Sequence, residues 1–226
     1  MLGNPDFDVL KFNISDPEVQ TLATKLHNVV MNGNLTIGTD ETFTDTLVDD
    51  VLRIAKLNHF PLMIRNHMPC KIYIEDKPLL STTPEFVVQN KDYTVIGVED
   101  KHLKNVGPVT GFGESQIAIE IVACGCENMR SIGYKYKKQT IFVIHVISTY
   151  FTFYKADIPA KYWKDLEKGL PKDSLIEVQR WPTMNGLMEG FDFAKPEGRK
   201  IVLEALAKFR HFLLPKKQSD MYKQNV

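Results

Sequence analysis

Apolar positions recur at helical spacing in two segments near the start of the chain. Ser15-Asp16-Pro17 predicts a helix start. Proline has no backbone N–H, and in the first turn of a helix that N–H would have no partner within the helix. The apolar positions that follow are Val19, Leu22, Ala23, Leu26, Val29 and Val30. Asn32-Gly33-Asn34 ends this helix. A second helix is expected to start near Thr39-Asp40 and to end by Asn58. Its apolar face is Phe43, Leu47, Val48, Val51, Ile54 and Ala55.

From Leu62 onward the pattern changes to short extended segments. The segments predicted to be strands are Lys71–Glu75, Glu85–Gln89 and Tyr93–Val98. Asn90-Lys91-Asp92 separates the last two and predicts a hairpin loop. A glycine-rich break covers Gly107–Gly113, and a helix is expected from Glu114 to Cys124.

The second half of the chain continues with alternating strands and helices. The remaining predicted elements are a buried strand Ile141–Ser148, its partner Phe151–Lys155, and helices at Pro159–Leu170 and Glu197–Leu213. The order α-α-β-β-β-α-β-β-α-α predicts an α/β fold. We interpret His145 as a satisfied core histidine and the aromatic run Tyr150–Tyr154 as a core hairpin. The polar segment after Pro215 is expected to be disordered.

Composition narrows the class of protein. The 226 residues suit one large domain, and 28 basic against 28 acidic residues give zero net charge, which argues against a protein that passively coats nucleic acid. The three cysteines, Cys70, Cys124 and Cys126, indicate buried thiols in a reducing compartment. We find no secretory signal, and the apolar run Ile141–Phe153 is too short to span a bilayer. The sequence thus predicts an intracellular protein, cytoplasmic or nuclear, without membrane contact.

Acidic and basic residues are arranged at the strand ends in an order that suits phosphodiester hydrolysis. Glu85 follows Pro84 at the entrance to one strand, and Glu99-Asp100-Lys101 ends the next strand. Glu99 and Lys101 are two residues apart, so they share a face, whereas Asp100 should point to the opposite side. Two carboxylates from one hairpin can bind Mg²⁺, and a neighbouring ammonium can orient the metal-bound water.

Two further residues complete the pattern. Glu41 lies in the first turn of the second predicted helix, and Gln116 lies at the start of the helix after the glycine-rich break. An acid in a first helical turn is favoured by the helix dipole whatever the function, and Asp45, Asp49 or Asp50 could take its place in a site. Glu120 lies one turn after Gln116 and is a weaker candidate.

These residues together resemble the PD-(D/E)XK nuclease superfamily. The segments DETFTDTLVDDVLRIA, VIGVEDKHLKN and GESQIAIEIVAC look more narrowly like the nuclease domain of Crinkler-like proteins. The resemblance covers roughly residues 40–155. It implies a restriction-endonuclease-like core with a central mixed β-sheet flanked by helices, and additional N- and C-terminal helices. The implied division is a helical extension at 1–38, a nuclease-like domain at 39–215 and a disordered tail at 216–226.

The resemblance also implies roles for single residues. Glu85 and Glu99 would bind Mg²⁺ or Mn²⁺, and Lys101 would be the catalytic lysine. Glu41 would be an outer or second-metal carboxylate, and Gln116 would orient the lysine or the substrate. The chain departs from the family at Glu85, where Asp is usual. The implied protein is a metal-dependent nuclease acting on DNA, and the alternative is an inactive nuclease-fold module that binds nucleic acid or protein.

Possible partner-binding residues lie outside this pattern. Lys135, Lys137 and Lys138 could contact a phosphate backbone, although a solvated turn explains them equally well. The terminal helices could form a homodimer. A third hypothesis is that the aromatic-rich C-terminal third binds a protein partner, for which exposed apolar area near Trp163 and Trp181 would be required.

Overall fold

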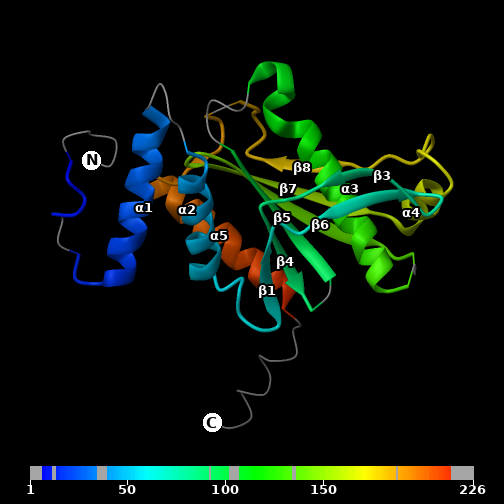
Figure 1. Cartoon of the computed structure of the whole chain (residues 1–226), viewed down its shortest axis with the longest axis horizontal. Helices are drawn as coiled ribbons and strands as arrows, with labels where there is room; N and C mark the ends of the chain where they lie inside the picture. Colours follow the sequence, from blue (N-terminus) through cyan, green and yellow to red (C-terminus); the bar gives the residue numbers. More distant parts are fainter. Residues whose placement is uncertain are drawn as a thin grey trace, which may run out of the picture.

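A computed structural model describes residues 7–11, 14–34, 40–91, 93–101, 107–133, 136–186 and 188–214. Its centre is a seven-stranded mixed sheet with strand order β1-β4-β5-β6-β7-β8, to which β9 is added through β7 (Figure 1). The strands are β1 (Leu62–Asn66), β4 (Phe86–Asn90), β5 (Tyr93–Lys101), β6 (Gln139–Ile147), β7 (Tyr150–Ile158), β8 (Val178–Trp181) and β9 (Phe191–Asp192). Among the strands of the described residues, β5 and β6 are the one pair that runs in parallel. The predicted α/β class, with a mixed sheet flanked by helices, is therefore confirmed.

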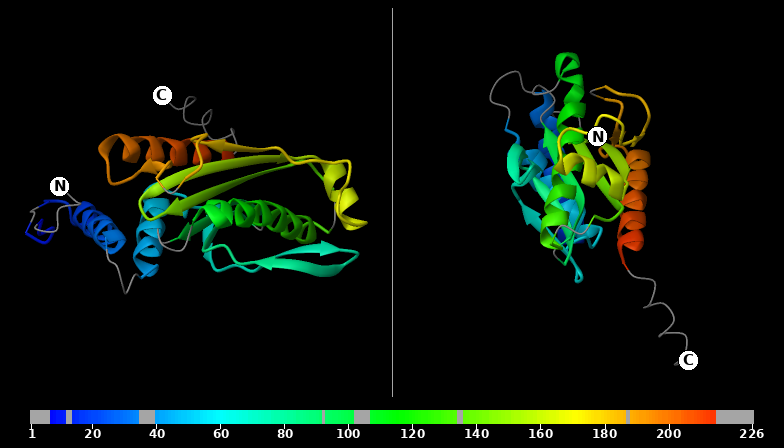
Figure 2. Two further views of the ribbon diagram at one scale, coloured as in Figure 1. Left: turned by 90° about the horizontal axis from the view of Figure 1, so that it is seen from above. Right: turned by 90° about the vertical axis from the view of Figure 1, so that its right-hand side faces the viewer.

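Helices cover both faces of the sheet (Figure 2). One face packs against α2 (Thr42–Ile54) and α5 (Pro196–Leu213), with α1 (Pro17–Asn34) stacked on α2. The other face packs against α3 (Glu114–Ser131), α4 (Ala160–Glu167) and a separate hairpin of β2 (Cys70–Ile74) and β3 (Lys77–Thr82). The 3-10 segment η1 (Pro108–Gly113) leads into α3. The core thus has two layers, one on each side of the sheet.

Strand β5 sends its side chains alternately into these two layers. Ile96 and Val98 belong to the core under α2 and α5. A Cβ at Gly97 would lie 3.9 Å from Cys124 in α3, so position 97 faces the other layer. The same alternation directs Glu99 and Lys101 toward α3, and Asp100 toward α2.

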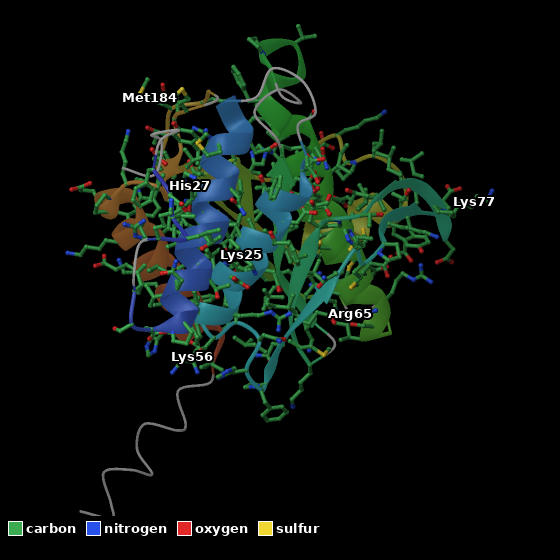
Figure 3. The ribbon with its side chains drawn as sticks, turned by 60° about the vertical axis from the view of Figure 1, so that its left-hand side comes forward. Lys25, His27, Lys56, Arg65, Lys77 and Met184 are labelled. Atoms are coloured by element: carbon green, nitrogen blue, oxygen red, sulfur yellow. The ribbon has the colours of Figure 1, made fainter. Side chains whose placement is uncertain are left out.

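Helix α1 is fastened to α2 by polar contacts as well as by apolar packing. Lys25 Nζ of α1 lies 2.7 Å from Asp50 Oδ2 of α2, so an ion pair links the two helices. Lys25 is labelled in Figure 3. The Asn32 side chain accepts from the backbone N–H of Asp40 at 3.1 Å and donates to its carbonyl at 2.8 Å. Helix α1, which lies within the segment 1–38 expected as a helical extension, therefore shares a core with the sheet through Leu26 and Val29.

Several predicted elements differ from the structure. The predicted strand Lys71–Glu75 lies in the separate β2–β3 hairpin and not in the central sheet. Four strands had no predicted counterpart: the edge strand β1 of the main sheet, the hairpin strand β3, and the short β8 and β9. Strand β3 is almost fully exposed and lacks the alternation that marks a half-buried strand. Helix α3 continues past the predicted end at Cys124 to Ser131. The start predicted at Thr39 and the tail from 216 lie outside the described residues.

Other sequence-based expectations are confirmed. All three cysteines are buried and free. The aromatic run Tyr150–Tyr154 lies in β7, with Phe151, Phe153 and Tyr154 buried in the core. Among the described residues, no helix is both long enough and apolar enough to cross a bilayer.

Gly125 lies where α3 packs closely against Trp163 of α4. A Cβ at this position would lie 2.3 Å from Cη2 of Trp163, whose indole is fully buried. We expect Gly125→Ala to destabilise the fold by about 2 kcal/mol, because the overpacking outweighs the gain in helix propensity. Urea unfolding measures this change. Gly107→Ala, where a Cβ would meet no atom within 4 Å, is the control; equal stability of both variants would contradict the expected packing.

Candidate functional site

The C-terminal end of β5 brings an acid and a base into direct contact. Lys101 Nζ lies 2.5 Å from Glu99 Oε1, and the side chains are 22 % and 2 % exposed. Burial disfavours the ammonium, but the hydrogen bond to Glu99 and the surrounding carboxylates raise the pKa of Lys101. The lysine is therefore a charged donor at neutral pH.

Helix α3 supplies a second contact to the same carboxylate. Gln116 Nε2 donates to Glu99 Oε1 at 2.5 Å and to Glu120 Oε1 at 3.1 Å. Gln116 lies in the first turn of α3, and Glu120 lies one turn later on the same face. The amide thus links two acids, one on the sheet and one on the helix. The weaker candidate Glu120 lies in this contact set.

Glu120 is fully buried and loses charge as a result. Burial, followed by repulsion from Glu99, raises the pKa of Glu120 to about 9. One oxygen of each acid, Glu120 Oε2 and Glu99 Oε2, is buried without a hydrogen-bond partner among the described residues. A buried carboxylate oxygen of this kind suits an added proton or a cation.

Glu85 joins the same side of the sheet through the strand register. Phe86 pairs with Val98 and Val87 pairs with Gly97 in the antiparallel β4–β5 ladder, so Glu85 continues the ladder beside Glu99. Burial, followed by the charge of Glu99, raises the pKa of Glu85. We call Glu85, Glu99, Lys101, Gln116 and Glu120 the β5 cluster.

His67 holds Glu85 in place, and sequence reasoning missed it. The His67 backbone N–H donates to the Glu85 carbonyl at 2.9 Å, and its Nδ1 lies 3.1 Å from Glu85 Oε2. The residue sits in a left-handed turn after β1, with φ of 49°. Because β1 was itself not predicted, no sequence pattern placed this histidine beside the acid.

Glu41 lies close enough to affect the cluster by its charge. It is the N-cap residue of α2, and its carboxylate is one of the charges that raise the pKa of Lys101. Glu41 was predicted in the first turn of this helix, and it lies one residue earlier, at the N-cap.

Asp100 faces away from the β5 cluster, as predicted, and lies against the alternative acid Asp45 of α2. Burial, followed by the Asp45 carboxyl, raises the pKa of Asp100 to about 10. Asp100 is fully buried, and neither of its oxygens meets a donor among the described residues. A proton retained by Asp100 supplies the donor that this pair otherwise lacks.

His145 lies next to Glu99 on the parallel strand β6. A Cβ at Gly113, the N-cap of α3, would lie 3.1 Å from His145 Cε1, so the ring packs under the start of that helix. Burial lowers the pKa of His145 to about 4, which keeps the ring neutral. The predicted core position is confirmed, but the prediction of a satisfied histidine is wrong, because Nε2 has no partner among the described residues.

Two of the three predicted phosphate-binding lysines, Lys137 and Lys138, lie far from the β5 cluster. Lys135 lies outside the described residues. Lys137 and Lys138 are exposed and precede β6, and Lys138 Nζ lies 3.7 Å from Asp157. Lys138 is seven residues before His145, about 23 Å along a strand at ~3.3 Å per residue. The structure therefore does not bring these lysines to the acidic end of β5.

The donor atoms of the β5 cluster fit a hard divalent cation. Mg²⁺ commonly binds one or two carboxylates and completes its shell with water and substrate phosphate. Glu85 and Glu99 offer such a pair, and the unpartnered Glu99 Oε2 is a ligand atom that neither Lys101 nor Gln116 occupies. In the part of the chain that is described, no three His, Cys, Asp or Glu side chains already surround a common metal position.

Comparisons with known proteins provide no family for this chain. No protein-family model matches it, and no curated protein matches it.

The protonated Asp100 makes the stability of the fold depend on pH. In the unfolded chain Asp100 loses its proton near pH 3.8, whereas in the folded protein it keeps it to about pH 10. The folded state binds more protons between these values, so stability falls as pH rises. We expect Asp100→Asn to stabilise the fold at pH 8 by at least about 1.4 kcal/mol, the equivalent of one pKa unit, and by much less at pH 4.

Urea unfolding of both proteins at the two pH values measures this difference. Asp157→Asn is the control, because Asp157 is an exposed aspartate whose pKa is lowered by Thr140 and Lys155. A loss of stability in Asp100→Asn that is the same at pH 4 and pH 8 would show that Asp100 is not held protonated.

Proposed function

We propose that this protein is a metal-dependent phosphodiesterase that cleaves nucleic acid, with DNA as the proposed substrate. The observation that carries the proposal is the contact of Lys101 and Gln116 with one oxygen of Glu99, while the other oxygen is left without a partner. The proposal includes the resemblance to PD-(D/E)XK nucleases and a restriction-endonuclease-like core. It also places the protein in the cytoplasm or nucleus, where buried free thiols persist.

Each residue of the β5 cluster has a proposed part in the reaction. Glu85 and Glu99 would hold Mg²⁺ or Mn²⁺, which when bound lowers the pKa of water and stabilises negative charge on phosphate oxygens. Lys101 keeps its proton, so it acts as a donor and positive charge toward the attacking water or the phosphate, and not as a general base. Gln116 fixes the orientation of the Glu99 carboxylate.

The position of the lysine is also suited to the charge that develops in the reaction. Phosphodiester cleavage builds negative charge on the phosphorus oxygens, and a preorganised cation at a mostly buried position stabilises that charge more than an exposed one. Lys101 is held at 2.5 Å from Glu99 on one strand, so little reorganisation is needed. Glu41 adds negative charge near this ammonium and helps to keep it protonated.

Removal of either charged partner should stop cleavage. We expect Glu99→Ala and Lys101→Ala to reduce plasmid nicking with Mg²⁺ or Mn²⁺ by at least about 100-fold, the usual cost of one preorganised electrostatic group. Glu99→Gln keeps the side-chain volume and should be equally inactive. Lys200→Ala, at an exposed lysine of α5, serves as the control. Wild-type activity in all variants, with circular dichroism unchanged, would refute the assignment.

Metal binding separates a nuclease from an inactive nuclease-fold module. We expect calorimetric titration with Mn²⁺ to show one binding event that Glu85→Gln and Glu99→Gln each weaken at least about 10-fold, because each removes a charged ligand. Glu18→Gln, at an exposed acid of α1, should leave the titration unchanged. Absence of Mn²⁺ binding to the wild-type protein would favour the inactive module.

A further inference from the structure

A groove lies between β8 and α5, on the face of the sheet opposite to the β5 cluster. Its volume is about 280 Å³, just below the ~300–1,000 Å³ range of small-molecule pockets. Aromatic side chains from four elements, β6, β7, α5 and β8, form its apolar part: Phe142, Phe153, Phe209 and Trp181. Strand β8 is an edge of the central sheet, so the groove opens at the side of the molecule.

Trp181 presents an indole on a fixed aromatic support. Its ring stacks on Phe153 with centroids 5.7 Å apart and planes at 29°, and it contacts Phe191 at 4.4 Å. Phe209 meets Phe153 edge-on at 5.6 Å. The Trp181 side chain nevertheless stays 47 % exposed, unlike Trp163, which is fully buried. The exposed apolar area that the third hypothesis required is therefore present at Trp181 and absent at Trp163.

The charged residues that line this aromatic surface are cationic, and two of the three are ion-paired with acids outside the lining. Lys155, Arg180 and Lys208 line the groove, and its described lining includes no acidic residue. The Arg180 guanidinium lies on the α3 face of the sheet, where its Nε is 3.0 Å from Glu114 Oε1 and 3.1 Å from the Tyr154 hydroxyl. Lys155 pairs with Asp157 at 2.9 Å, an acid outside the lining. Lys208 is exposed on α5 next to Phe209. The groove thus suits a ligand that combines a flat apolar surface with negative charge.

We propose that the β8–α5 groove binds an unpaired nucleobase of a single-stranded nucleic acid, with the base stacked on Trp181 and a flanking phosphate beside Lys208. A base offers a π-face to an indole, and its flanking phosphates offer the anionic charge that Lys208 favours. Stacking needs little reorganisation, because the indole is already supported by Phe153 and Phe191. This inference rests on the proposed function in its choice of nucleic acid as ligand.

The groove and the β5 cluster are separate sites on one sheet. Trp181, Phe153, Ile144 and Val98 are register partners across four neighbouring strands, and Val98 is next to Glu99. Three strand spacings correspond to about 14 Å in the plane of the sheet. The sheet lies between the two sites, because the groove is on the α5 face and the β5 cluster is on the α3 face, so substitutions at Trp181 leave the acidic residues untouched.

Tryptophan fluorescence tests the groove directly, because Trp181 is the exposed one of the two tryptophans. An oligothymidylate of about ten nucleotides, within the usual site size of single-strand binders, is titrated in EDTA without added metal. We expect saturable quenching of the wild-type protein. An oligomer with the same phosphates but abasic sugars should bind at least about 5-fold more weakly, since stacking contributes ~1–3 kcal/mol per base. Equal binding of the two oligomers would overturn the proposal.

Substitutions locate the binding within the groove. By anisotropy of a labelled oligothymidylate, Trp181→Ala should weaken binding about 10-fold, Trp181→Phe should retain most of it, and Lys208→Glu should weaken it and reduce its salt dependence. Lys200→Glu, on the same helix, is the matched charge control and should have a smaller effect. The result that would overturn the proposal is wild-type affinity in Trp181→Ala.

A competitor separates nucleic acid from a protein ligand. The acidic copolymer of glutamate and tyrosine has charge and aromatic rings but no bases. If it displaced the oligomer with equal affinity and its own binding depended on Trp181, the groove would be a docking site for protein, and the nucleobase proposal would be wrong. Weak competition is the expected result.

Two outcomes distinguish a failure of the groove proposal from a failure of the proposed nuclease activity. Binding in EDTA that depends on Trp181, without cleavage in Mg²⁺ or Mn²⁺, would support the groove and refute the phosphodiesterase. Cleavage that depends on Glu99, together with single-strand binding that Trp181→Ala leaves unchanged, would support the phosphodiesterase and refute the groove proposal.

Discussion

The burial of the Glu99 carboxylate is the constraint on which the candidate site depends. A charged group at 2 % side-chain exposure is costly unless opposite charge and hydrogen bonds meet it, and here Lys101 and Gln116 both contact Oε1. The neighbouring acid Glu120 meets the same difficulty by keeping its proton. The remaining oxygen of Glu99 has no partner among the described residues, which is the feature that a divalent cation would complete.

Because side chains alternate along a strand, the two acidic residues of β5 lie on opposite faces of the sheet. Glu99 and Lys101 face α3 and belong to the proposed reaction, whereas Asp100 faces α2 and forms a buried acid pair with Asp45. That pair joins the sheet to the helix whose N-cap is Glu41. The helix α2 and the ladder of β4 and β5 therefore set the position of each acid relative to Lys101. A change in this packing would alter the electrostatics of the ammonium without removing any site residue.

Sequence reasoning could predict contacts that follow from local periodicity. Glu99 and Lys101 had to share a face because they are two residues apart on a strand, and Gln116 had to lie near the start of the next helix. The contacts of His145 and His67 could not be predicted, because one depends on the parallel register of β5 with β6 and the other on the unpredicted strand β1. Strand β3 was missed because its exposed residues do not alternate. The proximity of Glu120 to Glu99 required the placement of α3 on the sheet, which no local pattern specifies.

A crystal structure of the protein soaked with Mn²⁺ tests the central claim most directly. An anomalous difference peak bounded by the carboxylates of Glu85 and Glu99, with the Lys101 ammonium alongside, is the predicted result. A fully occupied Mn²⁺ elsewhere on the molecule, with no metal at the carboxylates of Glu85 and Glu99, would contradict it.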